Sequence, residues 1–526
     1  MSRMSRSAAA APAPSSGRSR SEGPLVLAAV CLSLLAIPLN FTGPAVAMPA
    51  IARSLGGDPV ALNWITNAFM LCFGGFLMVA GTLADGYGRK RLFLIGQAVF
   101  LAATLALALV RDLVVLDLLR GVQGLSGAAA FSAGVAALAQ EFDGPARTRA
   151  FSLIGTTFGV GLAFGPLLAG LLVDAFGWQA IFLCSALLTV TALGVGFCFM
   201  RDSRDPGAAG LDWPGAISFT AALTCLTYAM LLAPDRGWGS PWVVGLLAGA
   251  VALAAIFVRV ETQVARPMLD LSLFRYPRFV GVQLLAAAPA YSFVVLLILL
   301  PLRFVGVEGW GGMGAGWMMM ALCGPMVVVP MLAAALTRWV SAGILCGAGL
   351  VVAAVGLVWL GQVPPGAPAG AMIPSLLVIG LGIGLPWGLM DGLAVSVVPK
   401  ERAGMAAGIF NTTRVAGEGI ALAVVGAILA GLARSGLSAA LPGDEPAGLA
   451  LAAQRLAMGD VAQAATALPQ AGHGLLVQAY GDAFHGLSFV LAAITLVSAA
   501  VVFGFLSRPA PAEELATQPA EVPAAE

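Results

Sequence analysis

The chain is long and strongly apolar: of its 526 residues 59% are hydrophobic and only 10% are charged, and its mean hydropathy is +0.94. Soluble globular chains carry roughly 25% charged residues, so this chain has too few to cover a water-facing surface, and its composition indicates a membrane protein. A net charge of +1 without a basic block excludes a polyanionic partner such as nucleic acid.

Both ends of the chain are polar. Residues 1–23 are rich in Ser, Ala, Pro and Arg, and we expect them, like residues 507–526, to be disordered tails. The apolar stretch after residue 23 is too long for the apolar core of a signal peptide, so we take it as the first membrane helix.

Fourteen apolar runs reach the length of about 20 residues that a helix needs to cross the hydrocarbon core. They lack the strict alternation of membrane β-strands. The predicted fold class is therefore an all-α membrane protein with 14 transmembrane helices. Their approximate limits are 25–50, 61–84, 91–110, 113–139, 149–173, 178–200, 212–233, 241–260, 277–301, 312–336, 340–361, 372–397, 403–431 and 481–506.

The basic residues predict the orientation of these helices. With the amino terminus in the cytoplasm, nineteen of the 27 Lys and Arg residues fall in cytoplasmic segments and six on the opposite side, while Arg120 and Arg414 lie within spans. Because cytoplasmic loops carry the excess of basic residues, we expect both termini to be cytoplasmic and the protein to be a multi-pass protein of the cell inner membrane.

One internal similarity suggests two related halves. The stretch GTTFGVGLAFG (155–165) aligns with NTTRVAGEGIA (411–421), and each opens about one turn into a helix that follows a basic loop. Repeats of this kind mark transporters whose substrate site lies between the halves. The expected organisation is a six-helix bundle over 24–200, two inserted helices within 201–275, and a second six-helix bundle over 276–506 with a periplasmic loop at 432–480.

Several chemistries are absent from the sequence. None of the seven cysteines forms a CxxC pair or neighbours a histidine, so we expect no metal site and no disulfide. Neither Lys90 nor Lys400, the only two lysines, follows a glycine, so the phosphate-binding sequence GxxxxGK[ST] is missing. We therefore expect neither an enzyme nor an ATPase, and no cofactor; a transporter of this sequence would use an ion gradient or downhill flow.

Charged residues at membrane depth cost about 2.5–3.5 kcal/mol each on insertion scales, so each one needs a reason. Asp117 and Arg120 are three residues apart on one helical face and could neutralise each other. Arg414 and Glu418 are four residues apart, with Asn411 on the same stripe. A structural ion pair and a functional site remain alternative interpretations of both pairs.

Asp391 is the most unusual of these charges. It lies eight residues before Pro399, which at 1.5 Å per residue places it about 12 Å into the bilayer. Trp387 lies one turn earlier, and no basic residue lies within a turn. Because desolvation penalises an unpaired carboxylate, we expect Asp391 to bind a proton or meet a cationic substrate; the alternative is a protonated acid that donates a hydrogen bond to a neighbouring helix.

The turn between the second and third spans carries a dense motif. The stretch GTLADGYGRKRL (81–92) contains Gly81, Asp85, Gly88, Arg89 and Lys90 at the spacing Gly-x-Leu-Ala-Asp-x-x-Gly-Arg-Lys-x-Leu. Glycines allow close helix contact and a tight turn, and the opposite charges could form a latch that breaks in another transporter state. The alternative is a basic loop that only sets topology. This motif resembles the cytoplasmic signature of the major facilitator superfamily.

Other stretches extend the resemblance to the fourteen-span drug:proton antiporters of that superfamily. LLRGVQGLSGAAA (118–130) resembles the span-4 motif, GVGLAFGPLLAG (159–170) the span-5 antiporter motif, and NWITNAFML (63–71), LDWPGA (211–216), PMLDLSLFR (267–275) and VPKERAGMAAGIFNTTR (398–414) other parts of the family. The resemblance implies the major facilitator fold, two six-helix bundles plus two extra central helices.

The resemblance also implies roles for individual residues. Asp85, Arg89 and Lys90 would gate the cytoplasmic side together with Gly81 and Gly88, and Gly165 with Pro166 would bend span 5. Arg120 would support proton transfer. From their position within the spans, and not from the resemblance, we expect Asp391 and Glu418 to be the titrating acids. The expected substrate-binding residues are Asn40, Phe69, Gln123, Trp387, Asn411 and Arg414.

One departure from the family matters. The family usually carries an aspartate where this chain has Asn40 in LNFTGPAVAMP (39–49). An asparagine can bind polar substrate groups but cannot titrate, so a proton would have to be carried elsewhere or not at all.

The function that we expect is proton-coupled efflux of small lipophilic or cationic compounds by alternating access. An importer or uniporter of one small metabolite, such as a vitamin, is the main alternative, and Asn40 favours it. A membrane receptor or scaffold without transport is a third. The expected partners are a small-molecule substrate, protons and the lipid bilayer, with a periplasmic adaptor as a further candidate, and we expect a monomer.

Overall fold

The computed structural model describes residues 23–56, 59–204, 212–237, 239–264, 269, 271–310, 312–398, 403–442 and 445–507. All regular elements in these ranges are helical, which confirms the predicted all-α class. The two expected disordered tails lie outside the described residues, apart from Gly23 and Ser507, and so do Pro399, Lys400 and Arg402.

Six long helices form the amino-terminal half. They are α1 (Gly23–Leu55), α2 (Pro59–Tyr87), α3 (Arg89–Leu107), α4 (Leu113–Glu141), α5 (Gly144–Phe176) and α6 (Gln179–Phe199). Helix α2 packs on α4, α3 on α4 and α6, and α1 on α5 and α6, and the six helices enclose two apolar clusters.

Two further helices stand between the halves. Helices α7 (Trp213–Arg236) and α8 (Pro241–Glu261) pack on each other, and α7 also contacts α2 and α16 (Ala403–Ala440). The inserted pair therefore joins both halves through α7.

The carboxy-terminal half contains several broken helices around a second core. Besides α16, its elements are η1 (Leu271–Arg275), α9 (Pro277–Pro289), η2 (Ala290–Val294), α10 (Val295–Leu302), η3 (Arg303–Val307), α11 (Gly312–Cys323), η4 (Gly324–Val327), α12 (Val329–Leu336), α13 (Ala342–Gly361), α14 (Ala369–Trp387), α15 (Met390–Ser396), α17 (Pro446–Ala457), α18 (Val461–Ala467) and α19 (His473–Leu506).

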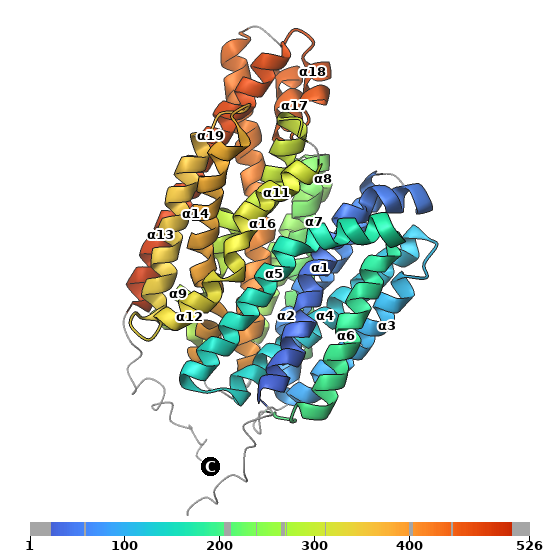
Figure 1. Cartoon of the computed structure of the whole chain (residues 1–526), viewed down its shortest axis with the longest axis vertical. Helices are drawn as coiled ribbons and strands as arrows, with labels where there is room; N and C mark the ends of the chain where they lie inside the picture. Colours follow the sequence, from blue (N-terminus) through green and yellow to red (C-terminus); the bar gives the residue numbers. More distant parts are fainter. Residues whose placement is uncertain are drawn as a thin grey trace, which may run out of the picture.

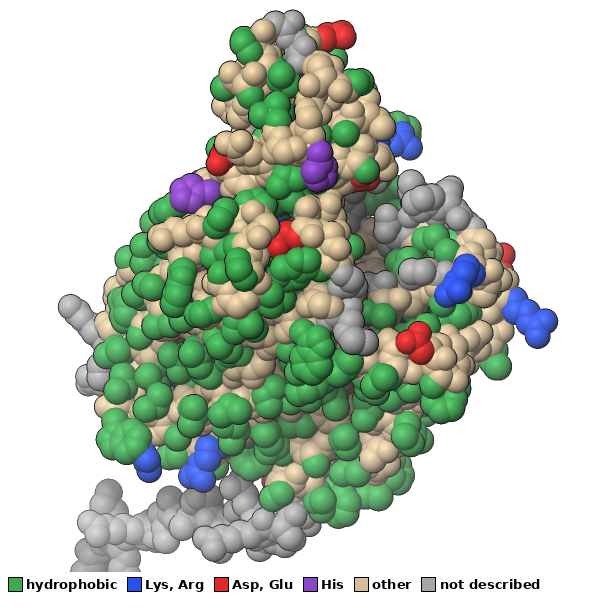
Figure 2. Space-filling view, turned by 45° about the horizontal axis from the view of Figure 1, so that its top comes forward, with side chains coloured by type: hydrophobic (Ala, Val, Ile, Leu, Met, Phe, Trp, Pro, Cys, Tyr) green, Lys and Arg blue, Asp and Glu red, His purple; other side chains and the backbone are tan. Residues whose placement is uncertain are grey.

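Thirteen stretches in the described residues are long and apolar enough to cross a membrane, three of them running through consecutive helical pieces such as α14 and α15. Helix α7 has 24 residues and completes the predicted set of fourteen. Hydrophobic side chains cover the flank of the molecule in Figure 2, as a surface that faces lipid requires.

The two ends of the molecule differ (Figure 1). Helix α1 begins and α19 ends at one end, which we call the terminal side, while α17 and α18 project from the other end, which we call the cap side. The predicted loop 432–480 consists of the end of α16, the helices α17 and α18, and the start of α19.

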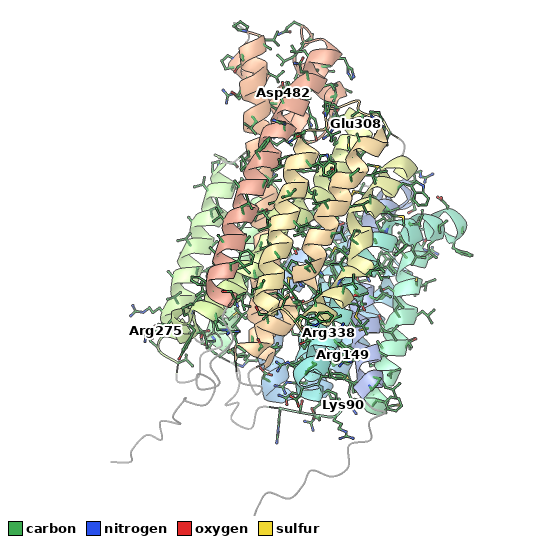
Figure 3. The ribbon with its side chains drawn as sticks, turned by 60° about the vertical axis from the view of Figure 1, so that its left-hand side comes forward. Lys90, Arg149, Arg275, Glu308, Arg338 and Asp482 are labelled. Atoms are coloured by element: carbon green, nitrogen blue, oxygen red, sulfur yellow. The ribbon has the colours of Figure 1, made fainter. Side chains whose placement is uncertain are left out.

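On the cap side, the turn between α17 and α18 packs closely on η3. Gly306 of η3 approaches the carbonyl oxygen of Gly459 so closely that a Cβ would collide with it. Arg303 Nε contacts Glu308 Oε1 at 2.8 Å, and both side chains are only 1% exposed. Arg303 also donates to the carbonyl oxygen of Val363 at 2.8 Å, so this pair ties η3 to the end of α13. Figure 3 shows Glu308 and Asp482 on this side.

Candidate functional site

The predicted latch at residues 81–92 joins the two halves on the terminal side. Asp85 ends α2 and is buried, and its Oδ1 accepts from Arg89 Nη2 at 2.7 Å. Its other oxygen accepts from the backbone N–H of Met405 at 2.8 Å, in the first turn of α16. A carboxylate at a helix amino terminus is favoured by the unpaired N–H groups and the helix dipole. Asp85 therefore binds the carboxy-terminal half, while Arg89 neutralises it.

The other residues of this motif stay within the amino-terminal half. Gly88 has φ +109°, a conformation that suits glycine, and a Cβ there would collide with Asp202. Lys90 Nζ donates to the carbonyl oxygen of Phe197 at the end of α6, at 2.8 Å. Gly81 is buried within α2.

Glycines of helix α5 allow close packing against two different neighbours. A Cβ at Gly165 would lie 2.6 Å from Thr42 Oγ1, so Gly165 packs against α1, and Pro166 stands inside the continuous helix. Nearer the terminal side, a Cβ at Gly155 would lie 2.7 Å from the carbonyl oxygen of Trp387, and one at Gly159 would lie 2.5 Å from that of Met326. The terminal half of α5 thus packs directly on backbone of the carboxy-terminal half.

Two hydrogen bonds reinforce this contact. Ser152 Oγ donates to the carbonyl oxygen of Gly388 at 2.6 Å, and Arg147 Nη2 donates to that of Val395 at 3.0 Å. Gly388 lies in the break between α14 and α15, where Pro386 supplies no N–H and the helix ends at Trp387. The two halves are therefore closed on each other at the terminal side.

Three of the predicted substrate residues form a polar cluster with Arg120 inside the amino-terminal half. Arg120 is fully buried; Nε donates to the Ile65 carbonyl oxygen and Nη2 to that of Asn40, each at 2.8 Å. Nη1 donates to Gln123 Oε1 at 2.5 Å, and the guanidinium lies 4.4 Å from the ring centroid of Phe69.

In the described residues, every group that accepts a hydrogen bond from Arg120 is neutral. Gln123 Nε2 donates to Asn40 Oδ1 at 3.1 Å, and Asn40 Nδ2 donates to Ser185 Oγ at 2.6 Å. Asp117 lies close enough for its charge to act on Arg120, but among the described residues the two form no direct ion pair, and Asp117 Oδ1 is buried without a hydrogen bond. The side chains of Asn40 and Gln123 are therefore hydrogen-bonded to each other and to Arg120.

A second buried site lies in the carboxy-terminal half. Asp391 stands at the start of α15 and is 5% exposed, and its Oδ2 lies 3.8 Å from Arg414 Nη1 on α16. The expectation of an unpaired Asp391 was therefore wrong, because its partner comes from a span distant in sequence. Asn411 Nδ2 donates to the Ala407 carbonyl oxygen at 2.8 Å. Within the part of the chain that the structure describes, neither the side-chain oxygen of Asn411 nor Asp391 Oδ1 has a hydrogen-bond partner.

Aromatic rings from both halves surround this pair. The Arg414 guanidinium lies 5.9 Å from the ring centroid of Phe131 on α4, 5.7 Å from that of Phe158 on α5 and 5.8 Å from that of Trp387 on α14. Glu418, one turn further along α16, is partly exposed. Asp391, Arg414 and Glu418 thus lie where the two halves meet.

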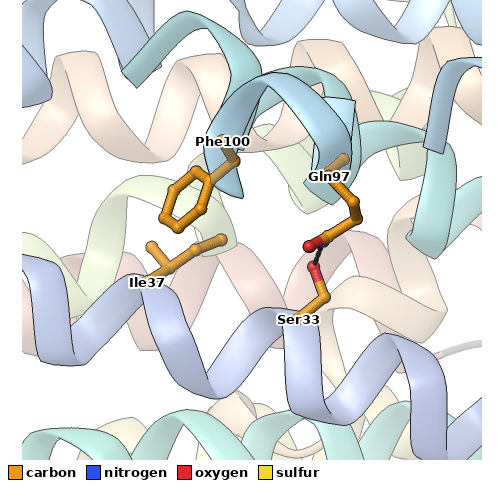
Figure 4. A pocket seen from close by; sticks show the side chains of 6 residues that line it. Ser33, Ile37, Gln97 and Phe100 are labelled. Carbon is orange, nitrogen blue, oxygen red and sulfur yellow. Dashed lines mark hydrogen bonds between the residues drawn. The ribbon is translucent and has the colours of Figure 1, made fainter. Parts of the chain in front are cut away.

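A small gap within the amino-terminal half is separate from these sites (Figure 4). It lies between α1, α3 and α4, beside Ile37 and Phe100, and the buried side chains of Gln97 and Ser33 are hydrogen-bonded across it. It offers no space between the halves.

The fold and this inter-half site define a membrane transporter. The family model of the Major Facilitator Superfamily matches residues 30–422, and the chain belongs to this family. This result confirms the resemblance read from the motifs.

Similar proteins support the same assignment. The chain is 31% identical over 408 residues to the multidrug resistance protein Stp of Mycobacterium tuberculosis, covering 77% of this chain and 76% of Stp. It is 30% identical over 527 residues to the tetracenomycin C resistance and export protein of Streptomyces glaucescens, covering 97% and 96%. The human organic anion transporter MFSD10 has the same fold, with a TM-score of 0.55 at 17% identity over 90% of this chain and 99% of that one.

Proposed function

We propose that this protein exports small lipophilic or cationic compounds in exchange for protons, with the terminal side in the cytoplasm. The names of its relatives, which include multidrug resistance and export proteins, support export. The excess of basic residues in the loops of the terminal side supports the orientation.

The observation that carries proton coupling is the Asp391–Arg414 pair. Both side chains are buried where the halves meet, and their contact at 3.8 Å is too long for a strong hydrogen bond. A proton on Asp391 removes the charge that attracts Arg414, so protonation loosens α15 from α16. Because α15 and the break before it also hold α5 through Val395 and Gly388, loosening α15 weakens the closure of the terminal side.

The cycle follows from this linkage. A proton reaches Asp391 from the cap side past the partly exposed Glu418, and the terminal side opens. The proton leaves to the cytoplasm, substrate binds among Phe131, Phe158 and Trp387, and the halves close again at the terminal side. The substrate then leaves to the cap side, where the next proton binds. Asp391 and Glu418 carry two negative charges against the one positive charge of Arg414 when both are ionised. The excess charge can be balanced by a proton or by a cationic substrate, which gives exchange.

Inside-out membrane vesicles test this proposal. With an imposed gradient that is acid inside, the wild type is expected to accumulate ethidium, a lipophilic cation. Asp391→Asn is expected to lose gradient-driven accumulation but to keep exchange of labelled for unlabelled ethidium, and Glu418→Gln is expected to slow accumulation. Asp482→Asn, on the exposed cap side, is the matched control. Undiminished accumulation by Asp391→Asn would contradict the proposal.

A second candidate is import or uniport of one small metabolite. It is favoured by Asn40, because the polar cluster of Arg120 holds a neutral amide where a proton carrier would need an acid. This candidate predicts that a deletion strain requires one nutrient and shows no added sensitivity to lipophilic cations.

A further inference from the structure

A crevice opens between the two halves on the terminal side, and neither Asp391 nor Arg414 lines it. It holds about 240 Å³, with Arg147 and Phe151 of α5 on one wall and Leu389, Leu393 and Ser396 on the other. A water molecule occupies about 30 Å³ in the liquid, so the space suits a phosphate with part of a glycerol rather than a whole lipid.

Arg147 gives this crevice a positive charge and an N–H group that is not hydrogen-bonded within the described residues. Its Nη2 donates to the Val395 carbonyl oxygen, but its Nε is buried and has no hydrogen-bond partner in the described part of the chain. A buried donor without an acceptor is costly, and an anionic oxygen in the crevice would satisfy it. The same side chain thus holds the halves together and points to an anion.

Basic residues at the same end of the molecule and apolar side chains in the crevice wall together favour an anion that also carries an apolar part. Arg149 and Arg338 lie at the same end of the molecule (Figure 3), and the Arg338 guanidinium lies 3.6 Å from the ring centroid of Trp339. Asp143 lies near Arg147 and opposes it in part. Phe151, Leu389 and Leu393 give the crevice an apolar wall, and Gly144 and Ala342, at the starts of α5 and α13, line it as well. Basic pockets between membrane helices match lipid headgroups.

We propose that this crevice binds the headgroup phosphate of an anionic phospholipid. Its two walls belong to different halves, so a lipid held there contacts both only when the terminal side is closed. A ligand that binds one of two states better shifts the population toward that state. Anionic lipid at this site therefore stabilises the closed terminal side.

Native mass spectrometry of the full-length protein, extracted from bilayers of phosphatidylcholine with and without phosphatidylglycerol, tests this inference. We expect one retained phosphatidylglycerol on the wild type, and about fivefold less on Arg147→Gln, the loss expected for one arginine at a charged headgroup. Gly392→Leu keeps the charge and fills the crevice, because a Cβ at Gly392 lies in ordinary contact with Phe151 at 3.5 Å. We expect Gly392→Leu to lose the retained lipid as well. Arg275→Gln, at an exposed position outside the crevice, is the control and should retain the lipid.

Added glycerol phosphate separates a headgroup site from a site for free phosphate compounds. Displacement of phosphatidylglycerol at equal concentration would assign the crevice to soluble phosphates and overturn the proposal. Equal retention of lipid by the wild type, Arg147→Gln and Gly392→Leu would also overturn it. Neither result depends on ethidium export, so the outcome is independent of the proposed function.

Discussion

At the scale of single residues, the structure shows two ways of burying an arginine in a membrane protein. Arg120 is surrounded by carbonyl and amide oxygens and by the ring of Phe69, and no carboxylate of the described residues forms an ion pair with it. Arg414 faces Asp391 instead. The first arrangement holds α1, α2 and α4 together in a fixed geometry. The second contains a group that can gain or lose a proton, so it is the one suited to coupling.

The buried pair Arg303–Glu308 gives a quantitative prediction. Glu308→Gln leaves Arg303 buried without its counter-charge, and breaking a buried pair in this way costs about 3–5 kcal/mol. We expect a clear fall in the midpoint of thermal unfolding in detergent. The side chains of Arg91 and Asp202 form an ion pair in which they are 73% and 41% exposed, respectively. Arg91→Gln breaks this exposed pair and should change the free energy of unfolding by less than about 1 kcal/mol. Equal effects of the two substitutions would contradict the assignment of Glu308 to the buried pair.

At the scale of elements, α5 is the helix that closes the terminal side. Its glycines and Ser152 allow its backbone to approach the carboxy-terminal half at Met326, Trp387 and Gly388. The break between α14 and α15 presents the carbonyl oxygen of Gly388 to Ser152 and places Asp391 one residue into α15. The closure of the terminal side and the proposed coupling site are therefore built on the same short segment.

Adding one methyl group to α5 tests its role in closure. In Gly159→Ala the new Cβ would lie 2.5 Å from the Met326 carbonyl oxygen, so the halves must separate there. We expect faster labelling of a cysteine placed at Leu389 by a water-soluble maleimide. Gly170→Ala, on the same helix with nothing within 4 Å of its Cβ, is the control. Unchanged labelling in Gly159→Ala would show that α5 does not hold the halves together.

At the scale of the whole molecule, much of the architecture could be predicted because membrane helices are specified by local composition. The length of each apolar run gave the fourteen spans, and the spacing around Asp85 and Arg89 gave the family. The partners of these residues could not be predicted. Met405, Gly388, Val395 and Met326 contribute backbone groups, which carry no signal in the sequence, and the contact of Arg414 with Asp391 depends on how two distant spans pack. The break after Pro386 was missed because apolar residues continue on both sides of it within the run 372–397.

The central claim is that protonation of Asp391 opens the terminal side. The most direct test is to measure the distance between two nitroxide labels by electron spin resonance. The labels replace Tyr87 and Trp339, which are exposed residues of opposite halves, in a protein from which the native cysteines have been removed. The account predicts a longer distance at acid than at alkaline pH in the wild type, and a long distance at both in Asp391→Asn. A distance that does not change with pH in the wild type, or that changes equally in Asp391→Asn, would contradict it.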